Sequence, residues 1–582
     1  MSDTSCSASK ETNSRVNGHA FSGVRYLIGL QIFVKLATFA MNTVVIYIAG
    51  RRAFGVASVR FQLLLSTILF LSREGMRDAL MRVSTSSSSA EPAADRPTKP
   101  TRQEQRIINA ALVPIAAGMA MATGMYLFYV AKSPQHTEST FSVDEPHYRL
   151  SLAINIVAAW IELCVEPLFV LSRARALFKM QAQCEGIAVL CRCAVVVTTL
   201  LFGRFVGTSP DDNPLRLVAF AAGQLGYAIA IVAAFAIYMS HELTYPVWRC
   251  YVPIPVALGH GIPTQSYIDR TLGGLAATFV GQSLLKFFLT QGDNMVMARF
   301  ATADEMGVFA FVSNYGSIPA RVVFLPLEEA SRAMFAGLAS VTSTKKTDMS
   351  SNAGKKTSAD LHSAKRVLLA LGKLQFLLGS ILVVFGTLYL PILVSLAQKS
   401  DSAVSQALVV YCLYLPFMGV NGFLEAFVHS VASRSQLLQI NIRMAAFAVV
   451  YMVVAVQSLR LFNLGSAGII SANMLNMTLR IAYCKRFISQ WFLERNVDGP
   501  QLASMRPHTA VIAACLLSGA VTVAASTVLA WLLRTALYQL TMLALGAVLG
   551  IAVLACIWRY EQPFIQTVRN LQTGQALHLK NE

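Results

Sequence analysis

The sequence predicts an all-α protein that crosses a membrane repeatedly, with about 14 transmembrane helices. Composition, a series of apolar segments and the placement of positive charge support this prediction. Of the 582 residues, 55% are hydrophobic and only 13% are charged, whereas a soluble domain carries about 25% charged residues. This composition excludes a disordered chain, a collagen-like chain and an ordinary soluble enzyme.

Fourteen segments of the sequence are apolar and long enough to cross a bilayer, which takes about 20 residues. Six come first, at 24–48, 55–72, 107–131, 150–171, 184–203 and 216–239. Six more follow, at 271–298, 308–326, 366–397, 404–430, 436–459 and 464–485. The last two lie at 509–533 and 536–558. We therefore expect an N-terminal tail, a first lobe, a connector, a second lobe, a linker, a final pair of spans and a C-terminal tail, at 1–23, 24–239, 240–270, 271–485, 486–508, 509–558 and 559–582.

Positive charge gathers in the loops after the second and eighth segments. Each loop holds seven Lys and Arg residues, the first between Arg73 and Arg106 and the second between Arg332 and Arg366. Because such residues accumulate on the cytosolic side, even-numbered exits and both termini are expected there. Much of the formal net charge of +18 is thus a topological signal, which argues against nucleic acid as a partner. Both loops have few apolar residues and are expected to be disordered.

Cysteine usage gives no sign of a disulfide framework or a metal site. Most of the ten cysteines lie inside apolar segments, where a thiol behaves as a small hydrophobe. Cys191 and Cys193 are two residues apart, which is not the spacing of a zinc or redox pair. We expect free, packed thiols and no bound metal or cofactor.

Weak matches between the two lobes indicate an internal repeat. Gln31 to Lys35 in the first segment resembles Gln282 to Lys286 in the seventh, and Gly55 and Gly307 open the second and eighth segments. The matches share an offset of about 250 residues. Parallel repeats of this kind occur in secondary transporters, whose substrate site lies at the repeat interface. We therefore expect two six-helix halves around a central cavity, plus two C-terminal helices.

Polar side chains recur at helical spacing inside several apolar segments. The basic members are Lys35, Arg60, Lys286, Arg321 and Arg443. The acidic and amide members are Asn42, Glu162, Glu166, Asp293, Asn421 and Glu425. Since a charge at the bilayer centre costs at least about 2.5 kcal/mol, we expect these side chains to line a shared hydrated cavity. Two alternatives stay open: Arg60 and Arg443 could snorkel to an interface, and Glu162 and Glu166 could serve as structural ion pairs.

Basic groups in a cavity suit an anionic substrate, because several cationic donors can hold a phosphate or a pyrophosphate. No segment has the G-x-x-x-x-G-K-[ST] pattern of a nucleotide-binding loop, so bound ATP is not expected to drive transport. The expected non-cytosolic loops are too short for the catalytic loop of a membrane glycosyltransferase. We therefore expect a transporter, with no enzymatic activity.

Four stretches resemble a known family. They are 56–60 with 65–74, 162–170, 314–329 and 421–427, and the third is the most specific. They are similar to the eukaryotic oligosaccharide-translocation family named Requiring Fifty Three, of the endoplasmic reticulum. The family's characteristic charged positions correspond to Arg60, Arg73, Glu74, Glu166, Arg321, Glu328, Glu329 and Glu425. The sequence departs from the family at Gln291 and Asn294, which replace an acid and a base, and at Lys35, where Arg is frequent.

The resemblance implies the fold of the bacterial lipid II flippases and multidrug exporters. It also implies a role in asparagine-linked glycosylation, in which a dolichyl-pyrophosphate oligosaccharide moves from the cytosolic to the lumenal leaflet of the endoplasmic reticulum membrane. Membrane lipids would be the other partners. Three alternatives stay open: a non-transporting accessory factor of the same pathway, a cation-coupled exporter of small molecules, and a phospholipid scramblase without sugar selectivity.

Overall fold

A computed structural model describes most of the chain outside its tails and longer loops. The described residues are 41, 43–85, 100–131, 147–175, 177–206, 214–257, 265–267, 270–329, 331–332, 334–335, 351–397, 402–495, 497, 505–532 and 535–566. They form two compact units, divided between Gly307 and Val308. The lobe boundaries expected from the sequence stay a prediction.

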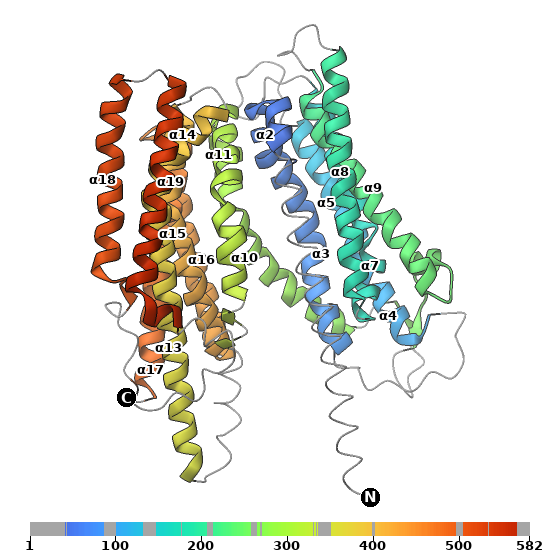
Figure 1. Ribbon diagram of the computed structural model, residues 1–582. Helices are drawn as coiled ribbons and strands as arrows, with labels where there is room; N and C mark the ends of the chain where they lie inside the picture. Colours follow the sequence, from blue (N-terminus) through green and yellow to red (C-terminus); the bar gives the residue numbers. More distant parts are fainter. Residues whose placement is uncertain are drawn as a thin grey trace, which may run out of the picture. The chain divides into compact units, whose positions relative to one another are not determined.

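The first unit is built almost entirely of helices (Figure 1). Its helices are α2 (Arg51–Val56), the π-helical turn η1 (Ala57–Phe61), α3 (Gln62–Thr85), α4 (Arg102–Ala111), α5 (Val113–Ala131), α6 (Tyr148–Leu163), α7 (Glu166–Ala174), α8 (Phe178–Val206), α9 (Arg216–Glu242), the 3-10 turn η2 (Val247–Tyr251) and α10 (Arg270–Phe300). Two short antiparallel strands, β1 (Val256–Ala257) and β2 (Gln265–Ser266), lie in the expected connector. Helix α11 (Ala303–Gly316) begins in this unit.

The second unit is also helical. After α11 it contains the π-helical turn η3 (Ala320–Phe324), α13 (Ser351–Ile381), the π-helical turn η5 (Leu382–Gly386), α14 (Thr387–Ala397), α15 (Ser402–Val431), α16 (Arg434–Arg460), α17 (Gly465–Leu493), α18 (Thr509–Leu532) and α19 (Thr535–Tyr560). The last two helices lie side by side (Figure 1). An aromatic core that includes Phe335, Phe427 and Phe492 joins α15 to α17.

Ten of the described helical segments are long and apolar enough to cross a membrane, and a pair bent by 43° (Ala303–Gly316 and Ala320–Glu329) would make eleven. The protein is therefore an all-α, multi-span membrane protein, as the sequence predicts. Helices α10 and α17 coincide with two further expected spans but are not among these ten segments. The expected first span, 24–48, falls mostly outside the described residues. The count of fourteen stays a prediction.

Two expected loops are shorter than the sequence suggested. The second span was expected to end at residue 72, but α3 continues to Thr85. This part of the prediction is wrong. Arg73 and Arg77 form ion pairs with acidic side chains on neighbouring helices, and these ion pairs hold this stretch in α3. The second charged loop, between Arg332 and Arg366, is also expected to be disordered, but α13 begins at Ser351. The residues there include Ala and Lys, which favour helix even outside a membrane.

Close backbone contacts determine how helices cross in the first unit. A Cβ on Gly55 would lie 2.2 Å from the backbone nitrogen of Gly307, so these two repeat-related glycines touch. A Cβ on Gly75 would lie 2.7 Å from Val280, at the crossing of α3 and α10. Both crossings require glycine because a larger side chain would push the helices apart.

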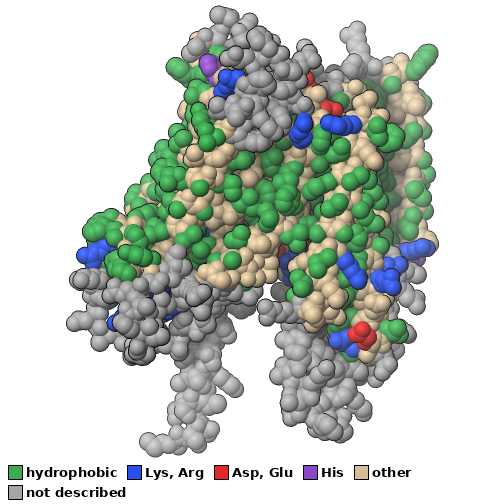
Figure 2. Space-filling model, turned by 180° about the vertical axis from the view of Figure 1, so that it is seen from behind, with side chains coloured by type: hydrophobic (Ala, Val, Ile, Leu, Met, Phe, Trp, Pro, Cys, Tyr) green, Lys and Arg blue, Asp and Glu red, His purple; other side chains and the backbone are tan. Residues whose placement is uncertain are grey.

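Surface chemistry follows the helix axes. In Figure 2 hydrophobic side chains cover most of the middle of the visible helices, and most visible Lys, Arg, Asp and Glu side chains lie toward the helix ends. This distribution is typical of helices whose middle parts contact hydrocarbon. Charged side chains along the middle of a span are therefore exceptions that need a separate explanation.

Candidate functional site

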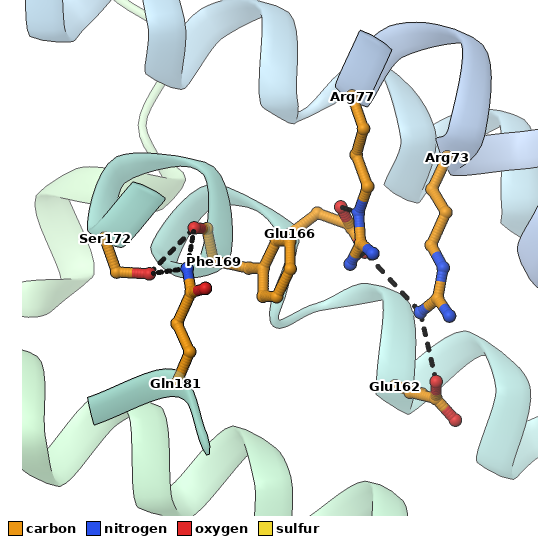
Figure 3. A network of polar contacts seen from close by, with 7 residues as sticks. All are labelled: Arg73, Arg77, Glu162, Glu166, Phe169, Ser172 and Gln181. Atoms are coloured by element: carbon orange, nitrogen blue, oxygen red, sulfur yellow. Dashed lines mark hydrogen bonds and ion pairs between the residues drawn. The ribbon is translucent and has the colours of Figure 1, made fainter. Parts of the chain in front are cut away.

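Two guanidinium groups and two carboxylates form a buried network in the first unit (Figure 3). Arg77 on α3 binds Glu166 at the start of α7 through two hydrogen bonds, of 2.8 and 2.5 Å. Nη1 of Arg73, one turn earlier on α3, lies 3.0 Å from Oε1 of Glu162 and 3.7 Å from Oε1 of Glu166. We call these four residues the buried network. It explains the acidic pair on α6 and α7 as ion-pair partners of α3.

Local chain geometry positions the buried network. The helical path breaks between α6 and α7 at Cys164 and Val165, and Pro167 occupies the first turn of α7, where its missing N–H costs nothing. Glu166 therefore lies at a helix N-terminus, which stabilises a carboxylate. The ring of Phe169 lies under the guanidinium of Arg77, 3.8 Å from Cζ to the ring centroid. Figure 3 also shows Gln181 binding Ser172 beside that ring.

Lys286 lies on α10 with 58% of its side chain exposed. Its ammonium donates to Oε1 of Glu74 on α3 at 2.7 Å and lies 5.5 Å from the ring centroid of Phe70. Both partners belong to the apolar segment Arg51–Leu80. Gln282 and Thr290, one turn before and after Lys286, are exposed as well. Helix α10 thus presents an exposed polar face alongside a membrane span.

Two of the expected basic residues lie in π-helical turns. Arg60 is the fourth residue of η1 and is buried, whereas Arg321 is the second residue of η3 and is exposed. The described residues contain one further π-helical turn, η5, which carries no charge. π-Helical turns inside α-helices are frequent at functional sites. Both π-helical turns therefore contain an arginine that the spacing of polar residues predicts as a cavity residue.

In the second unit, the family motifs of the eighth and tenth spans pack together. A Cβ on Gly422 would lie 3.0 Å from Oε2 of Glu328, so that carboxylate lies against α15. Glu425, three residues later on α15, binds Arg480 of α17 at 2.6 Å. Asn421 is buried on the same helix. These contacts give Glu328, Asn421 and Glu425 places in the packing of the unit, whereas Glu329 is exposed.

Arg443 lines a surface pocket of about 280 Å³ between α16 and α17. Its Cζ lies 5.0 Å from the ring centroid of Tyr483. Arg486, Trp491 and Glu494 line the same pocket. Arg443 is thus an accessible cation at one end of two helices, as the snorkelling alternative also requires.

A second pocket, of about 320 Å³, lies inside the first unit and contains a basic residue that the sequence analysis missed. Arg192 of α8 lines it, together with Asn155 of α6 and Gln224 of α9. No hydrogen bond or ion pair joins the Arg192 side chain to a described residue. The available signal was a single charge in the middle of the expected span 184–203, which the high average hydropathy of that span concealed.

The remaining expected residues have less definite places. Lys35 and Asn42 lie outside the described residues. Asp293 is half-buried on α10. Within the described part of the chain, no three His, Cys, Asp or Glu side chains gather as metal ligands would. The nine described cysteines are free thiols, as the sequence predicted for them.

Comparisons with known proteins identify the family. The family model described as "Rft-1: Rft protein" matches residues 19–571. The chain belongs to the Rft family. Two Rft relatives are named "Man(5)GlcNAc(2)-PP-dolichol translocation protein RFT1". The one from Eremothecium gossypii is 28% identical over 84% of this chain and 86% of its own. The one from Schizosaccharomyces pombe is 29% identical over 85% of this chain and 88% of its own. The resemblance noted in the sequence is therefore confirmed.

The fold of this Rft protein is also similar to a solved transporter structure. The structure titled "Lipid II flippase MurJ, inward closed conformation" matches with a TM-score of 0.53 and 11% sequence identity, covering 91% of this chain and 99% of that chain. At this identity the likeness concerns the fold alone. It confirms the flippase-like architecture that the family resemblance implied.

Proposed function

We propose that this Rft protein translocates a dolichyl-pyrophosphate-linked oligosaccharide across the endoplasmic reticulum membrane for asparagine-linked glycosylation. Both termini would lie in the cytosol. Membership of the Rft family and the names of the relatives support the substrate, and the compartment follows from the role that the family resemblance implies. The proposed reaction is transport, with no covalent change in the lipid.

The exposed ammonium of Lys286 carries the proposal. Its side chain is 58% exposed, although it lies alongside a segment apolar enough to cross the membrane. An exposed charge at that depth is costly in hydrocarbon and is tolerated where it lines a water-filled cavity. Glu74 neutralises part of this charge but leaves donors of the ammonium available. A hydrated surface with available cationic donors suits the pyrophosphate end of the lipid.

The other basic residues would act with Lys286. We propose that Lys35, Arg60, Arg321 and Arg443 bind or guide the pyrophosphate. Arg321 supports this role by its exposure, and Arg60 and Arg321 by their π-helical turns. Asn42, Asp293, Asn421 and Glu425 would provide polar or acidic surroundings. The dolichyl chain would stay in lipid, and alternating access would move the headgroup across.

The test is leaflet crossing by the purified protein in liposomes. A labelled dolichyl-pyrophosphate oligosaccharide would be incorporated, and a lectin or glycosidase outside the vesicles would report which leaflet holds it. The proposal expects crossing that depends on the protein and exceeds crossing in protein-free vesicles. Crossing equal to that in protein-free vesicles would favour the accessory-factor alternative. Equal crossing of a phospholipid without sugars would favour the scramblase alternative.

A further inference from the structure

The pocket that contains Arg192 lies entirely within the first unit. Its lining residues are Met41 and Val45, which precede α2, and residues of α2, η1, α3, α6, α8 and α9. Arg192 lies near the centre of the apolar segment Phe178–Phe205, about 20 Å along the helix axis from either end at 1.5 Å per residue. A hydrocarbon core of about 30 Å centred on this segment would place Arg192 about 15 Å from either surface, which is longer than an Arg side chain. Snorkelling therefore does not explain Arg192.

The cation Arg192 has no ion-pair partner among the described residues. The buried network contributes two cations and two anions, and these pair with one another. Glu162 acts on Arg192 electrostatically, but its two oxygens already accept from Arg73 and Gln224, at 3.0 and 3.1 Å. Arg192 therefore adds one positive charge that the buried network does not neutralise. An uncompensated charge in a site of low dielectric is costly, and a bound anion would remove that cost.

The pocket has the donors that a phosphate requires. Arg192 supplies guanidinium N–H groups in a fork that matches two phosphate oxygens. The hydroxyl of Ser58 and the amide of Gln62 line the same pocket. Gln224 is 3% exposed, and its Oε1 accepts no hydrogen bond from a described residue, so it can accept from a hydroxyl, a water or a protonated phosphate oxygen. The polar groups form one end of a potential binding site.

The rest of the pocket is apolar. Ten of its fifteen lining residues carry apolar side chains or a thiol, among them Phe54, Phe61 and Phe220. Its volume of about 320 Å³ falls at the low end of the range of roughly 300–1,000 Å³ for small-ligand sites. Such a site fits a phosphate and the first isoprene units, with the remaining chain outside. A free inorganic anion would leave the aromatic surface unused.

We propose that this pocket binds the phosphate end of an isoprenoid phosphate, with Arg192 as the charged anchor. The assignment of an isoprenoid ligand rests on the proposed function, which it deepens by adding a phosphate subsite in the first unit. The position of Arg192 and the composition of the pocket are independent of that function.

Binding of farnesyl phosphate to the purified full-length protein tests the proposal. Replacement of Arg192 by Gln removes the anchor charge, so the dissociation constant should rise at least about tenfold. Arg192→Lys should recover part of the affinity, because the charge remains but the fork is lost. Arg204→Gln is the matched control: Arg204 is an exposed cation on the same helix and does not line the pocket. It should bind as the parent does.

Two further probes separate the phosphate from the tail. Farnesol should bind more weakly than farnesyl phosphate and should not respond to Arg192→Gln. Inorganic phosphate should displace labelled farnesyl phosphate only at concentrations far above those of the unlabelled lipid. Equal binding by the parent and Arg192→Gln, or equal displacement by inorganic phosphate and farnesyl phosphate, would overturn the proposal. If Arg192→Gln fails to fold, Ala57→Leu fills the pocket while leaving Arg192 in place and should weaken binding as well.

The outcomes of the two experiments are distinguishable. If the protein binds farnesyl phosphate through Arg192 but shows no leaflet crossing, the binding site is supported and the proposed translocation is contradicted. If the protein shows leaflet crossing but its binding of farnesyl phosphate does not depend on Arg192, the proposed translocation is supported and the binding site is contradicted.

Discussion

The ammonium of Lys286 lies 2.7 Å from Oε1 of Glu74, which joins α10 to α3 across 212 residues of sequence. The pair is uneven, with 58% of the Lys286 side chain and 23% of the Glu74 side chain exposed. An ion pair this open contributes at most about 1 kcal/mol to stability. The position of Lys286 therefore points to a role other than holding the helices together.

Replacing Lys286 with Gln should impair transfer of the pyrophosphate lipid much more than it impairs folding. The expected change in unfolding free energy is below about 1 kcal/mol. Loss of one charged hydrogen bond to the substrate would reduce transfer roughly ten- to a hundredfold. Glycan occupancy in cells that depend on the variant, together with its abundance in membranes, would measure both effects. Arg299→Gln, in the last turn of the same helix, is the control. Normal occupancy with Lys286→Gln would contradict a substrate role for this lysine.

Replacing Glu166 with Gln should destabilise the first unit strongly. Glu166 is fully buried, and its loss would leave the guanidinium of Arg77 without its bidentate partner. Removing one partner of a buried pair costs about 3–5 kcal/mol. Thermal unfolding of the purified variant would measure the loss. Glu494→Gln breaks an exposed pair with Arg495 and should change little. Similar melting of the two variants would show that the buried network is not structural.

The α3 extension and Arg192 show where reasoning from the sequence fails. The apolar segments, the family motifs and most candidate charges could be found from the sequence, because each signal lies within one stretch of chain. Arg73 and Arg77 suggested a cytosolic loop because their partners lie 89 residues away. The high mean hydropathy of the span 184–203 concealed Arg192, and its role became evident only from the pocket that it lines. Contacts between distant segments carry this information, and periodicity within one helix does not.

Adding a methyl group at Gly55 should disturb the packing of α2 in the first unit. The Cβ of Gly55→Ala would meet the backbone of Gly307 at 2.2 Å, and backbone cannot move aside as a flexible side chain does. Gly124→Ala is the control, because no atom of the described residues lies within 4 Å of its Cβ. Helix propensity alone would favour Ala by up to about 1 kcal/mol at either position. A lower melting temperature for Gly55→Ala but not for Gly124→Ala is expected. Equal melting of both variants would argue against the close approach.

Cys250, in η2 of the connector, should resist alkylation in the folded protein. Burial raises the pKa of its thiol to about 11, and the carboxylate of Glu104 adds to the increase. At pH 7.5 only a few in roughly 10,000 such thiols would be ionised, and the thiolate is the reactive form. Mass spectrometry after maleimide treatment should find Cys250 unmodified between pH 7 and 9 and modified after denaturation. Rapid modification of the folded protein at pH 7.5 would contradict this environment.

The most direct test of the account compares the parent protein with Lys286→Gln in the same liposome assay. Both would be reconstituted at equal density with labelled dolichyl-pyrophosphate oligosaccharide, and the initial rate of leaflet crossing would be measured. The account predicts crossing by the parent and a rate reduced roughly ten- to a hundredfold by the variant. Equal rates for the two proteins, or no crossing by the parent above empty vesicles, would contradict it.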